Sequence, residues 1–142
     1  MSELFDRLKE AVGPAGFIAG DDVGPRYFTD VADKLGPKPN LVLRPASTAE
    51  VSEILALCHA AGQPLVPQGG MTGLVGAGLP AEGEVALSLE RLNAIEEIDS
   101  ESGTMTVGAG AVLQTIQEAA LAKGFSFPLD LGGRGSCTIG GN

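Results

Sequence analysis

The chain has 142 residues, of which 44% are hydrophobic and 19% charged, so wholesale disorder is excluded and one globular domain with its own core is expected. A formal net charge of −9 argues against a nucleic-acid or anionic-membrane surface. Cys58 and Cys137, with one histidine, cannot form a zinc site. Residues 1–8 lack the features of a signal or transit peptide, and no stretch has the length of a membrane span. A reduced cytoplasmic protein is therefore expected.

In chain order, the apolar spacing predicts an amphipathic helix over residues 2–12, which ends at Gly13-Pro14. Residues 16–40 are rich in Gly, Pro and Asp, and this composition predicts a loop. Tyr27 and Phe28 are expected to anchor that loop to the core.

A buried strand is predicted over residues 41–43, followed by a second helix. Ser47 and Glu50 have the spacing of a capping box that opens this helix, and Gly62 ends it. One apolar stripe is predicted along the helix, made by Val51, Ile54, Leu55 and Cys58.

Further strands are predicted over residues 65–66 and 85–89. Residues 94–99 and 104–109 then have the pattern of a β-hairpin, and residues 111–123 that of a third helix. Strand–helix–strand followed by a hairpin and a helix predicts an α+β domain.

The most informative segment is the first glycine loop, residues 66–81, which is rich in glycine and has no charged residue. It offers no acid, base or metal ligand, but glycine allows backbone N–H groups to approach an anion closely. An unspecified surface loop is the competing interpretation. Leu74, Val75 and Leu79 are unusual for a disordered linker, so binding of a diphosphate-containing cofactor is favoured.

A second candidate for phosphate binding is the segment 107–113, Val-Gly-Ala-Gly-Ala-Val-Leu, with Asp130 about where a dinucleotide fold has its ribose-binding acid. Leu113 stands where that fingerprint needs a small residue. The strand before the motif also belongs to the predicted hairpin rather than to a parallel βαβ unit. A strand-to-helix turn that needs a permissive backbone is the favoured interpretation.

Two motifs in the same order resemble the FAD-linked oxidases of the vanillyl-alcohol-oxidase type, and within them the D-2-hydroxyglutarate and D-lactate dehydrogenase branch. They are Pro67-Gln68-Gly69-Gly70-x-Thr72-Gly73-Leu74-Val75-Gly76 and the segment 128–142, which contains Gly135-Ser136-Cys137-Thr138-Ile139-Gly140-Gly141-Asn142. The resemblance covers about residues 26–142. It implies the N-terminal part of a PCMH-type FAD-binding domain.

In such proteins both glycine loops hold the FAD diphosphate with backbone amides. The first loop would contribute Pro67, Gln68, Gly69, Gly70, Thr72, Gly73 and Leu74. The second glycine loop, residues 132–142, would contribute Gly135, Ser136, Thr138, Ile139, Gly140, Gly141 and Asn142. Members of the family often carry Asn or another polar residue where this chain has Met71, so one polar contact near the cofactor is expected to be missing.

The resemblance also implies a domain organisation. Residues 1–39 would form an N-terminal helix and loop, residues 40–90 a first subdomain, and residues 91–142 the start of a second subdomain. The chain stops inside the second glycine loop, so we expect a fragment that lacks the substrate domain of its relatives.

Four other features have plainer interpretations. His59 is expected to be a partly exposed helix residue, and Cys137 a small buried residue rather than a covalent flavin link. Arg134 is either a phosphate-screening cation or a solvated loop residue. The acidic run 96–101 is expected to be the solvated end of the hairpin.

The sequence is consistent with two functions. The resemblance implies an FAD-dependent enzyme that oxidises a small D-2-hydroxy acid by hydride transfer, with the substrate bound by the absent domain and with homo-oligomers allowed. No residue here is a credible catalytic base, so the chain alone is expected to be inactive. The alternative is a non-catalytic folded fragment or assembly module that does not retain FAD.

Overall fold

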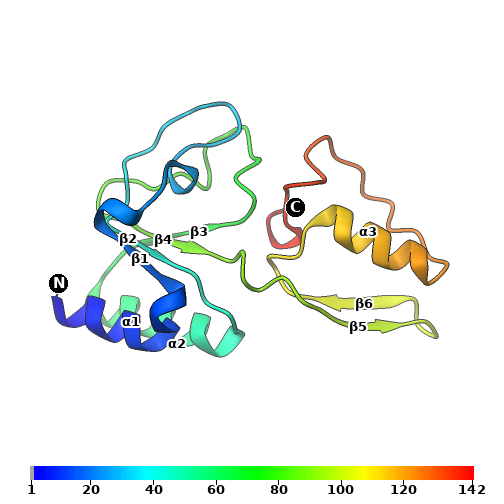
Figure 1. The fold of residues 1–142 in the computed structure, drawn as a ribbon, viewed down its shortest axis with the longest axis horizontal. Coiled ribbons are helices and arrows are strands. Elements are labelled where there is room, and N and C mark those ends of the chain that lie inside the picture. Colours follow the sequence, from blue (N-terminus) through cyan, green and yellow to red (C-terminus); the bar gives the residue numbers. More distant parts are fainter. Residues whose placement is uncertain (1) are drawn as a thin grey trace.

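The computed structural model describes residues 2–142 as two lobes joined by a short linker (Figure 1). The first lobe, residues 2–88, contains a sheet with two helices, and the second lobe, residues 95–142, contains a hairpin and one helix. Residues 89–94 form the linker. Mixed helices and strands in two separate sheets confirm the predicted α+β class.

The first lobe is built on a four-stranded sheet with strand order β1-β2-β4-β3. The strands are β1 (Phe17–Ala19), β2 (Leu41–Leu43), β3 (Leu65–Gln68) and β4 (Val85–Ser88). β4 pairs in parallel with both β2 and β3, whereas β1 pairs antiparallel with β2. Strands β3 and β4 therefore end at the same edge of the sheet, and the first glycine loop connects them.

Strand β1 lies in the segment where the sequence predicts only loop. Three residues between glycines are too short to show a period, and their pairing partner β2 is distant in sequence. The same segment contributes two short 3-10 turns, η1 (Gly20–Asp22) and η2 (Pro25–Tyr27). Tyr27 is buried and Phe28 partly buried, so the predicted anchoring of this segment is confirmed.

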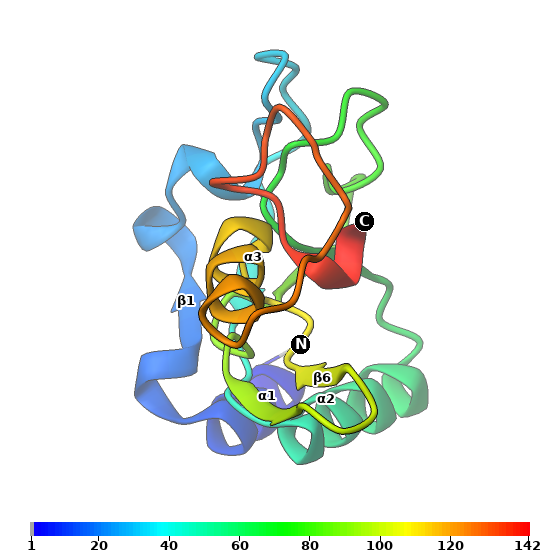
Figure 2. The same ribbon diagram turned by 90° about the vertical axis from the view of Figure 1, so that its right-hand side faces the viewer.

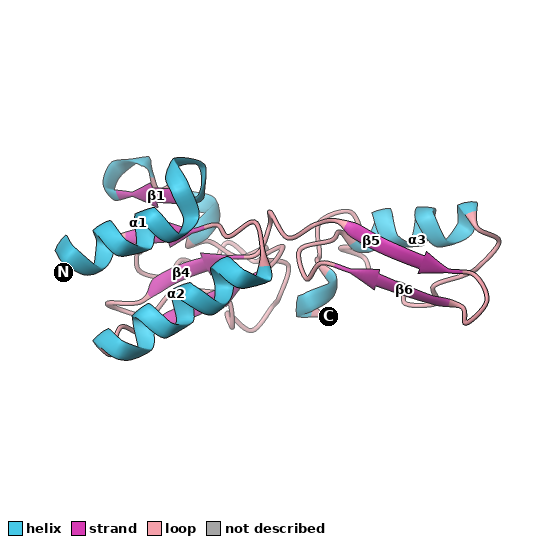
Figure 3. Cartoon of the chain, turned by 90° about the horizontal axis from the view of Figure 1, so that it is seen from below, coloured by secondary structure: helices cyan, strands magenta, loops and turns pink. Residues whose placement is uncertain are grey.

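Helices α1 (Ser2–Gly16) and α2 (Thr48–Ala61) pack side by side on one face of the sheet (Figure 3). Gly13 has φ 65° and interrupts α1, as the Gly-Pro pair predicts. On α2, Leu55 is 46% exposed, so its predicted inward position is wrong. Leu57 occupies the core instead, because the sheet contacts the helix along a line displaced from the predicted stripe.

Alternate residues of β2 point to opposite faces of the sheet and build two cores. Leu41 and Leu43 face the helices, in a cluster with Leu8, Ile54 and Leu87. On the opposite face, the smaller cluster consists of Val23, Tyr27, Val42, Val66 and Ala86. This second cluster supports the loops that project from the top of the first lobe.

The predicted capping box at the start of α2 is confirmed. Ser47 Oγ accepts a hydrogen bond from the Glu50 amide at 3.2 Å, and Glu50 Oε2 accepts from the Ala46 amide at 2.7 Å. We expect Ser47→Ala to lower the free energy of unfolding by about 1 kcal/mol, because the substitution leaves an N-terminal amide of the helix without its acceptor. Urea denaturation measures the change. Ser52→Ala, at an exposed position inside the same helix, is the control, and an equal effect of both variants would contradict this role.

The second lobe contains the antiparallel hairpin β5 (Ile95–Asp99) and β6 (Thr104–Val107), helix α3 (Leu113–Ala122) and the 3-10 turn η3 (Ile139–Gly141). Asp99 closes the hairpin, because its carboxylate accepts hydrogen bonds from the Glu101 and Ser102 amides and from the Ser102 hydroxyl. These bonds lower the pKa of the Asp99 carboxyl. Among residues 2–142, no helix has the length and apolarity that crossing a membrane requires.

Candidate functional site

The two glycine loops meet between the lobes, where residues of both line one cavity (green and red segments in Figure 1 and Figure 2). A Cβ atom on Gly69 would collide with the Thr138 hydroxyl. One on Gly70 would overlap the Ser136 carbonyl and lie 3.0 Å from the Cys137 Cα. Glycine at positions 69 and 70 thus lets one main chain pack directly against the other.

The first loop presents free backbone donors. Within residues 2–142, none of the four consecutive amides of Gly70–Gly73 donates to a protein acceptor. Neighbouring amides that lack internal partners form an anion-binding surface. They suit a diphosphate, as the sequence predicts.

The second loop differs from the expectation that both loops donate amides to a phosphate. The amides of Ile139 and Gly140 donate to the carbonyls of Ala111 and Ala109, at 2.9 and 2.8 Å. Five of the nine other amides in this loop are also engaged internally, namely those of Arg134, Ser136, Cys137, Gly141 and Asn142. These bonds fix the second loop onto the segment that precedes α3. The residues that it contributes to the cavity between the loops are Thr138, Gly141 and Asn142.

A cavity of about 290 Å³, which we call the loop cavity, lies between the two glycine loops. Of the predicted site residues it brings together Pro67, Gly69, Gly70, Thr72, Gly73, Thr138, Gly141 and Asn142. A neighbouring cavity of about 300 Å³ also contains Gly70 and Thr72, and adds Gln68 and Ser136.

Four predicted residues line neither cavity. Leu74 is 77% exposed, and Gly135 lies outside both. Ile139 lines an apolar cavity beneath α3. Gly140 packs against Ala109, whose Cβ lies 2.7 Å from the position that a Cβ on Gly140 would take.

Asp30 is a site residue that the sequence analysis missed. Its side chain is buried in both cavities, and its Oδ2 atom has no hydrogen-bond partner in the described structure. The buried Gln68 Oε1 atom also lacks one, although Gln68 Nε2 donates to the carbonyls of Tyr27 and Gly78. No local sequence pattern marks Asp30, because it reaches the loop cavity through the tertiary fold.

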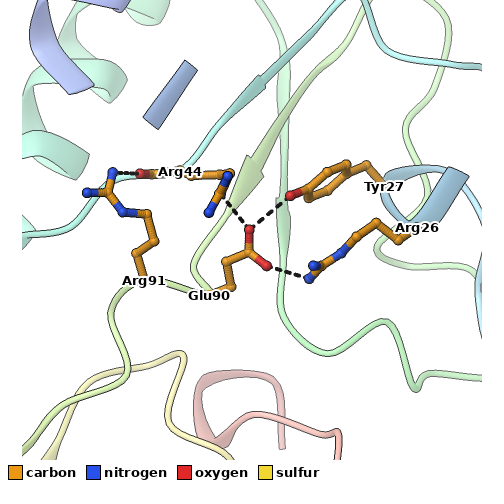
Figure 4. A network of polar contacts seen from close by, with 5 residues as sticks. All are labelled: Arg26, Tyr27, Arg44, Glu90 and Arg91. Atoms are coloured by element: carbon orange, nitrogen blue, oxygen red, sulfur yellow. Dashed lines mark hydrogen bonds and ion pairs between the residues drawn. The ribbon is translucent and has the colours of Figure 1, made fainter. Parts of the chain in front are cut away.

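A polar network beside the site fixes the start of the linker (Figure 4). Glu90 accepts a hydrogen bond from the Tyr27 hydroxyl at 2.9 Å and forms ion pairs with Arg26 and Arg44. Arg91 donates to the Arg44 carbonyl at 2.7 Å. Burial and the hydrogen bond to Glu90 raise the pKa of the Tyr27 hydroxyl, which therefore stays protonated as a donor.

The segment 107–113 has a structural role, which confirms the interpretation of a turn. A Cβ on Gly108 would overlap the Leu92 carbonyl, and one on Gly110 would overlap the Leu89 carbonyl. The Gly110 amide donates to the Leu92 carbonyl at 2.8 Å. These glycines hold the second lobe against the linker, and the preceding strand is antiparallel, as expected.

Met71 adopts a left-handed backbone conformation with φ 55°, which is unfavourable for a long side chain and tolerated by Asn. A polar residue at this position therefore has a backbone advantage that requires no contact with a ligand. We expect Met71→Asn to raise the free energy of unfolding by about 0.5–1 kcal/mol, measured by chemical denaturation. Thr72→Asn, in the same loop but without this constraint, is the matched control. A destabilised Met71→Asn variant would show that packing of the methionine outweighs the strain.

Comparison with known proteins decides the family. Residues 39–142 match the model of the FAD-binding domain. The chain belongs to this FAD-binding domain family. It is 39% identical over 135 residues to a mitochondrial D-2-hydroxyglutarate dehydrogenase of Arabidopsis thaliana, covering 95% of the chain and 24% of that protein. It is also 39% identical over 138 residues to a mitochondrial protein of Schizosaccharomyces pombe named as a D-lactate dehydrogenase, covering 97% and 25%.

The fold agrees with the family. The FAD-binding domain superposes on alkyldihydroxyacetonephosphate synthase with a TM-score of 0.87 and 23% identity, covering 99% of the chain and 31% of that structure. The fold that the resemblance implies is thus confirmed. The chain spans about a quarter of the length of its curated relatives.

The site fits FAD in its donor chemistry, because Gly70–Gly73 line the loop cavity and their free amides are suitable donors for a diphosphate. Three other residues that the sequence singled out, His59, Cys137 and Arg134, do not line the loop cavity. His59 is exposed on α2, as predicted, and Cys137 is a small buried residue, as predicted. Arg134 lies 3.5 Å from Asp130, is more than half exposed and does not line the loop cavity.

Proposed function

We propose that this FAD-binding domain serves a dehydrogenase that oxidises a small D-2-hydroxy acid. Identity of about 39% to proteins named for D-2-hydroxyglutarate and D-lactate oxidation supports the substrate class. FAD, when bound, would accept a hydride from the carbon that carries the hydroxyl group. The chain's own residues bind and orient the cofactor, and none of them is a candidate for the catalytic base.

The observation that supports cofactor binding most directly is the set of free amides of Gly70–Gly73. Four neutral donors in one loop can neutralise part of a diphosphate's charge without a basic residue in that loop. The second glycine loop contributes Thr138, whose hydroxyl is a neutral donor and acceptor. The domain limits proposed for residues 1–39, 40–90 and 91–142 follow the family resemblance.

Reduction of a dye acceptor tests the activity. The gene product that contains this chain is assayed with the D- and L-enantiomers of 2-hydroxyglutarate and lactate. We expect reduction with a D-enantiomer, and the 142-residue chain is expected to give none. If the gene product has bound flavin but reduces no dye with either D-acid, the proposal is contradicted. Turnover by the 142-residue chain alone would contradict the inference that it contains no catalytic base.

Absorbance at flavin wavelengths tests the second candidate, a folded module without cofactor. We propose that the 142-residue chain takes up FAD weakly, because each glycine loop supplies only part of the contacts. A titration that saturates supports cofactor binding, whereas a colourless chain that takes up none at millimolar FAD supports the module. For location, the free, buried Cys58 and Cys137 are compatible with the cytoplasm, and fractionation of cells tests this.

A further inference from the structure

A third segment, residues 30–34, lies against the first glycine loop. The Val31 amide donates to the Met71 carbonyl at 3.1 Å, which ties the segment to the loop. Asp30 Oδ1 accepts hydrogen bonds from the amides of Ala32 and Lys34, at 2.9 and 3.0 Å. The Asp30 amide donates in turn to the Lys34 carbonyl at 3.1 Å. The segment is thus a turn held by hydrogen bonds among its own residues.

This turn places a cation at the edge of the loop cavity. The Lys34 Nζ atom lies 3.0 Å from the position that a Cβ on Gly76 would take, and Gly76 lines the loop cavity. Gly76 has φ 75°, so a glycine at this position serves both the backbone and the space for the ammonium group. Lys34 thereby lies beside the first glycine loop, which has no charged residue.

The surrounding charges leave this cation available. Within residues 2–142, no carboxylate lies at ion-pair distance from the Lys34 ammonium. Arg134, the cation of the second glycine loop, is paired with Asp130. The buried Asp30 side chain lines the loop cavity, and the chain has a net charge of −9, so an incoming anion meets unfavourable charge that a nearby cation would partly offset.

We propose that Lys34 binds the diphosphate of FAD and is the cation that complements the neutral amides of Gly70–Gly73. The inference rests on the cofactor binding described above and extends the site to a segment that precedes the family match at residue 39. The ammonium reaches the anion from the turn formed by residues 30–34. The amides approach the same anion from the first glycine loop.

Calorimetric titration of the 142-residue chain with FAD and with inorganic pyrophosphate tests the assignment. Lys34→Gln is expected to lower the affinity for both ligands about fivefold at low salt, because it removes one charge-assisted contact that is open to water. Lys34→Arg is expected to restore most of the affinity. The difference between Lys34→Gln and the wild type should largely vanish at about 1 M salt, where screening acts over about 3 Å.

Lys38→Gln is the matched control, because it removes the same charge from a lysine whose ammonium pairs with the exposed Asp21 at 3.8 Å. Equal affinities of Lys34→Gln and the wild type would overturn the inference and leave cofactor binding intact. Equal losses of affinity in Lys34→Gln and Lys38→Gln would also overturn it, because they would indicate an effect of net charge and not of a contact made by Lys34. A loss for FAD but not for pyrophosphate would overturn the assignment to the diphosphate. A wild-type chain that binds neither ligand at millimolar concentration would overturn cofactor binding by this chain as well.

Discussion

Replacing Gly70 with alanine is expected to separate the two glycine loops and to weaken FAD binding about thirtyfold. The new Cβ would overlap the Ser136 carbonyl group, with the carbonyl carbon at 2.8 Å and the Cys137 Cα at 3.0 Å. These atoms are backbone on a loop held by hydrogen bonds to the segment before α3, so no flexible side chain can move aside. Overpacking of this kind costs about 2 kcal/mol, which corresponds to that loss of affinity.

Fluorescence titration with FAD gives the affinity, and small-angle X-ray scattering gives the separation of the lobes. Gly132→Ala is the control from the second glycine loop, because its Cβ would meet no atom within 4 Å and the residue lines neither cavity. We expect a larger radius of gyration for Gly70→Ala and no change for Gly132→Ala. Wild-type affinity and dimensions in Gly70→Ala would show that the loops can pack without glycine at this position.

Gly110→Ala is expected to have the largest effect on stability. Its Cβ would overlap the Leu89 carbonyl and approach the Leu92 oxygen to 3.1 Å, while the Gly110 amide must keep its bond to the same Leu92 oxygen. The segment and the linker cannot both stay in place. We expect a loss of about 3 kcal/mol in the free energy of unfolding, or about 10 °C in the thermal midpoint.

Hydrogen exchange locates the damage of Gly110→Ala. Amides of β5, β6 and α3 are expected to lose protection, whereas those of β2, β4 and α2 keep theirs, because the first lobe has its own core. Gly24→Ala is the control, with φ −75° and open space around its Cβ. Uniform loss of protection over both lobes would contradict the local origin of the effect.

Sequence patterns predicted those parts of the fold that depend on neighbours along the chain. The capping box of Ser47 and Glu50, the left-handed Gly62 and the hairpin around Asp99 each involve residues a few positions apart. Strand β1 and the inward position of Leu57 were not predicted, because both are decided by pairing or packing with distant segments. The local hydrophobic pattern does not identify partners that are distant in sequence.

The same distinction applies to the candidate site. The glycine motifs marked both loops, but the sequence could not tell which amides remain free. The use of the Ile139 and Gly140 amides by Ala111 and Ala109 depends on how the tail folds back. The place of Asp30 and Lys34 depends on a turn that docks onto a later loop. The motifs therefore predicted the kind of group that binds the ligand, whereas the tertiary fold determines which atoms are available to bind it.

The bonding of the second glycine loop has a consequence for the thermodynamics of cofactor uptake. Because its main chain is already held by internal acceptors, this loop has little conformational entropy left to lose when a dinucleotide arrives. Ordering costs should then fall mainly on the first loop, whose exposed Leu74 and Val75 make it the less constrained partner. Rigidifying that loop alone should therefore improve affinity chiefly through a smaller entropic penalty.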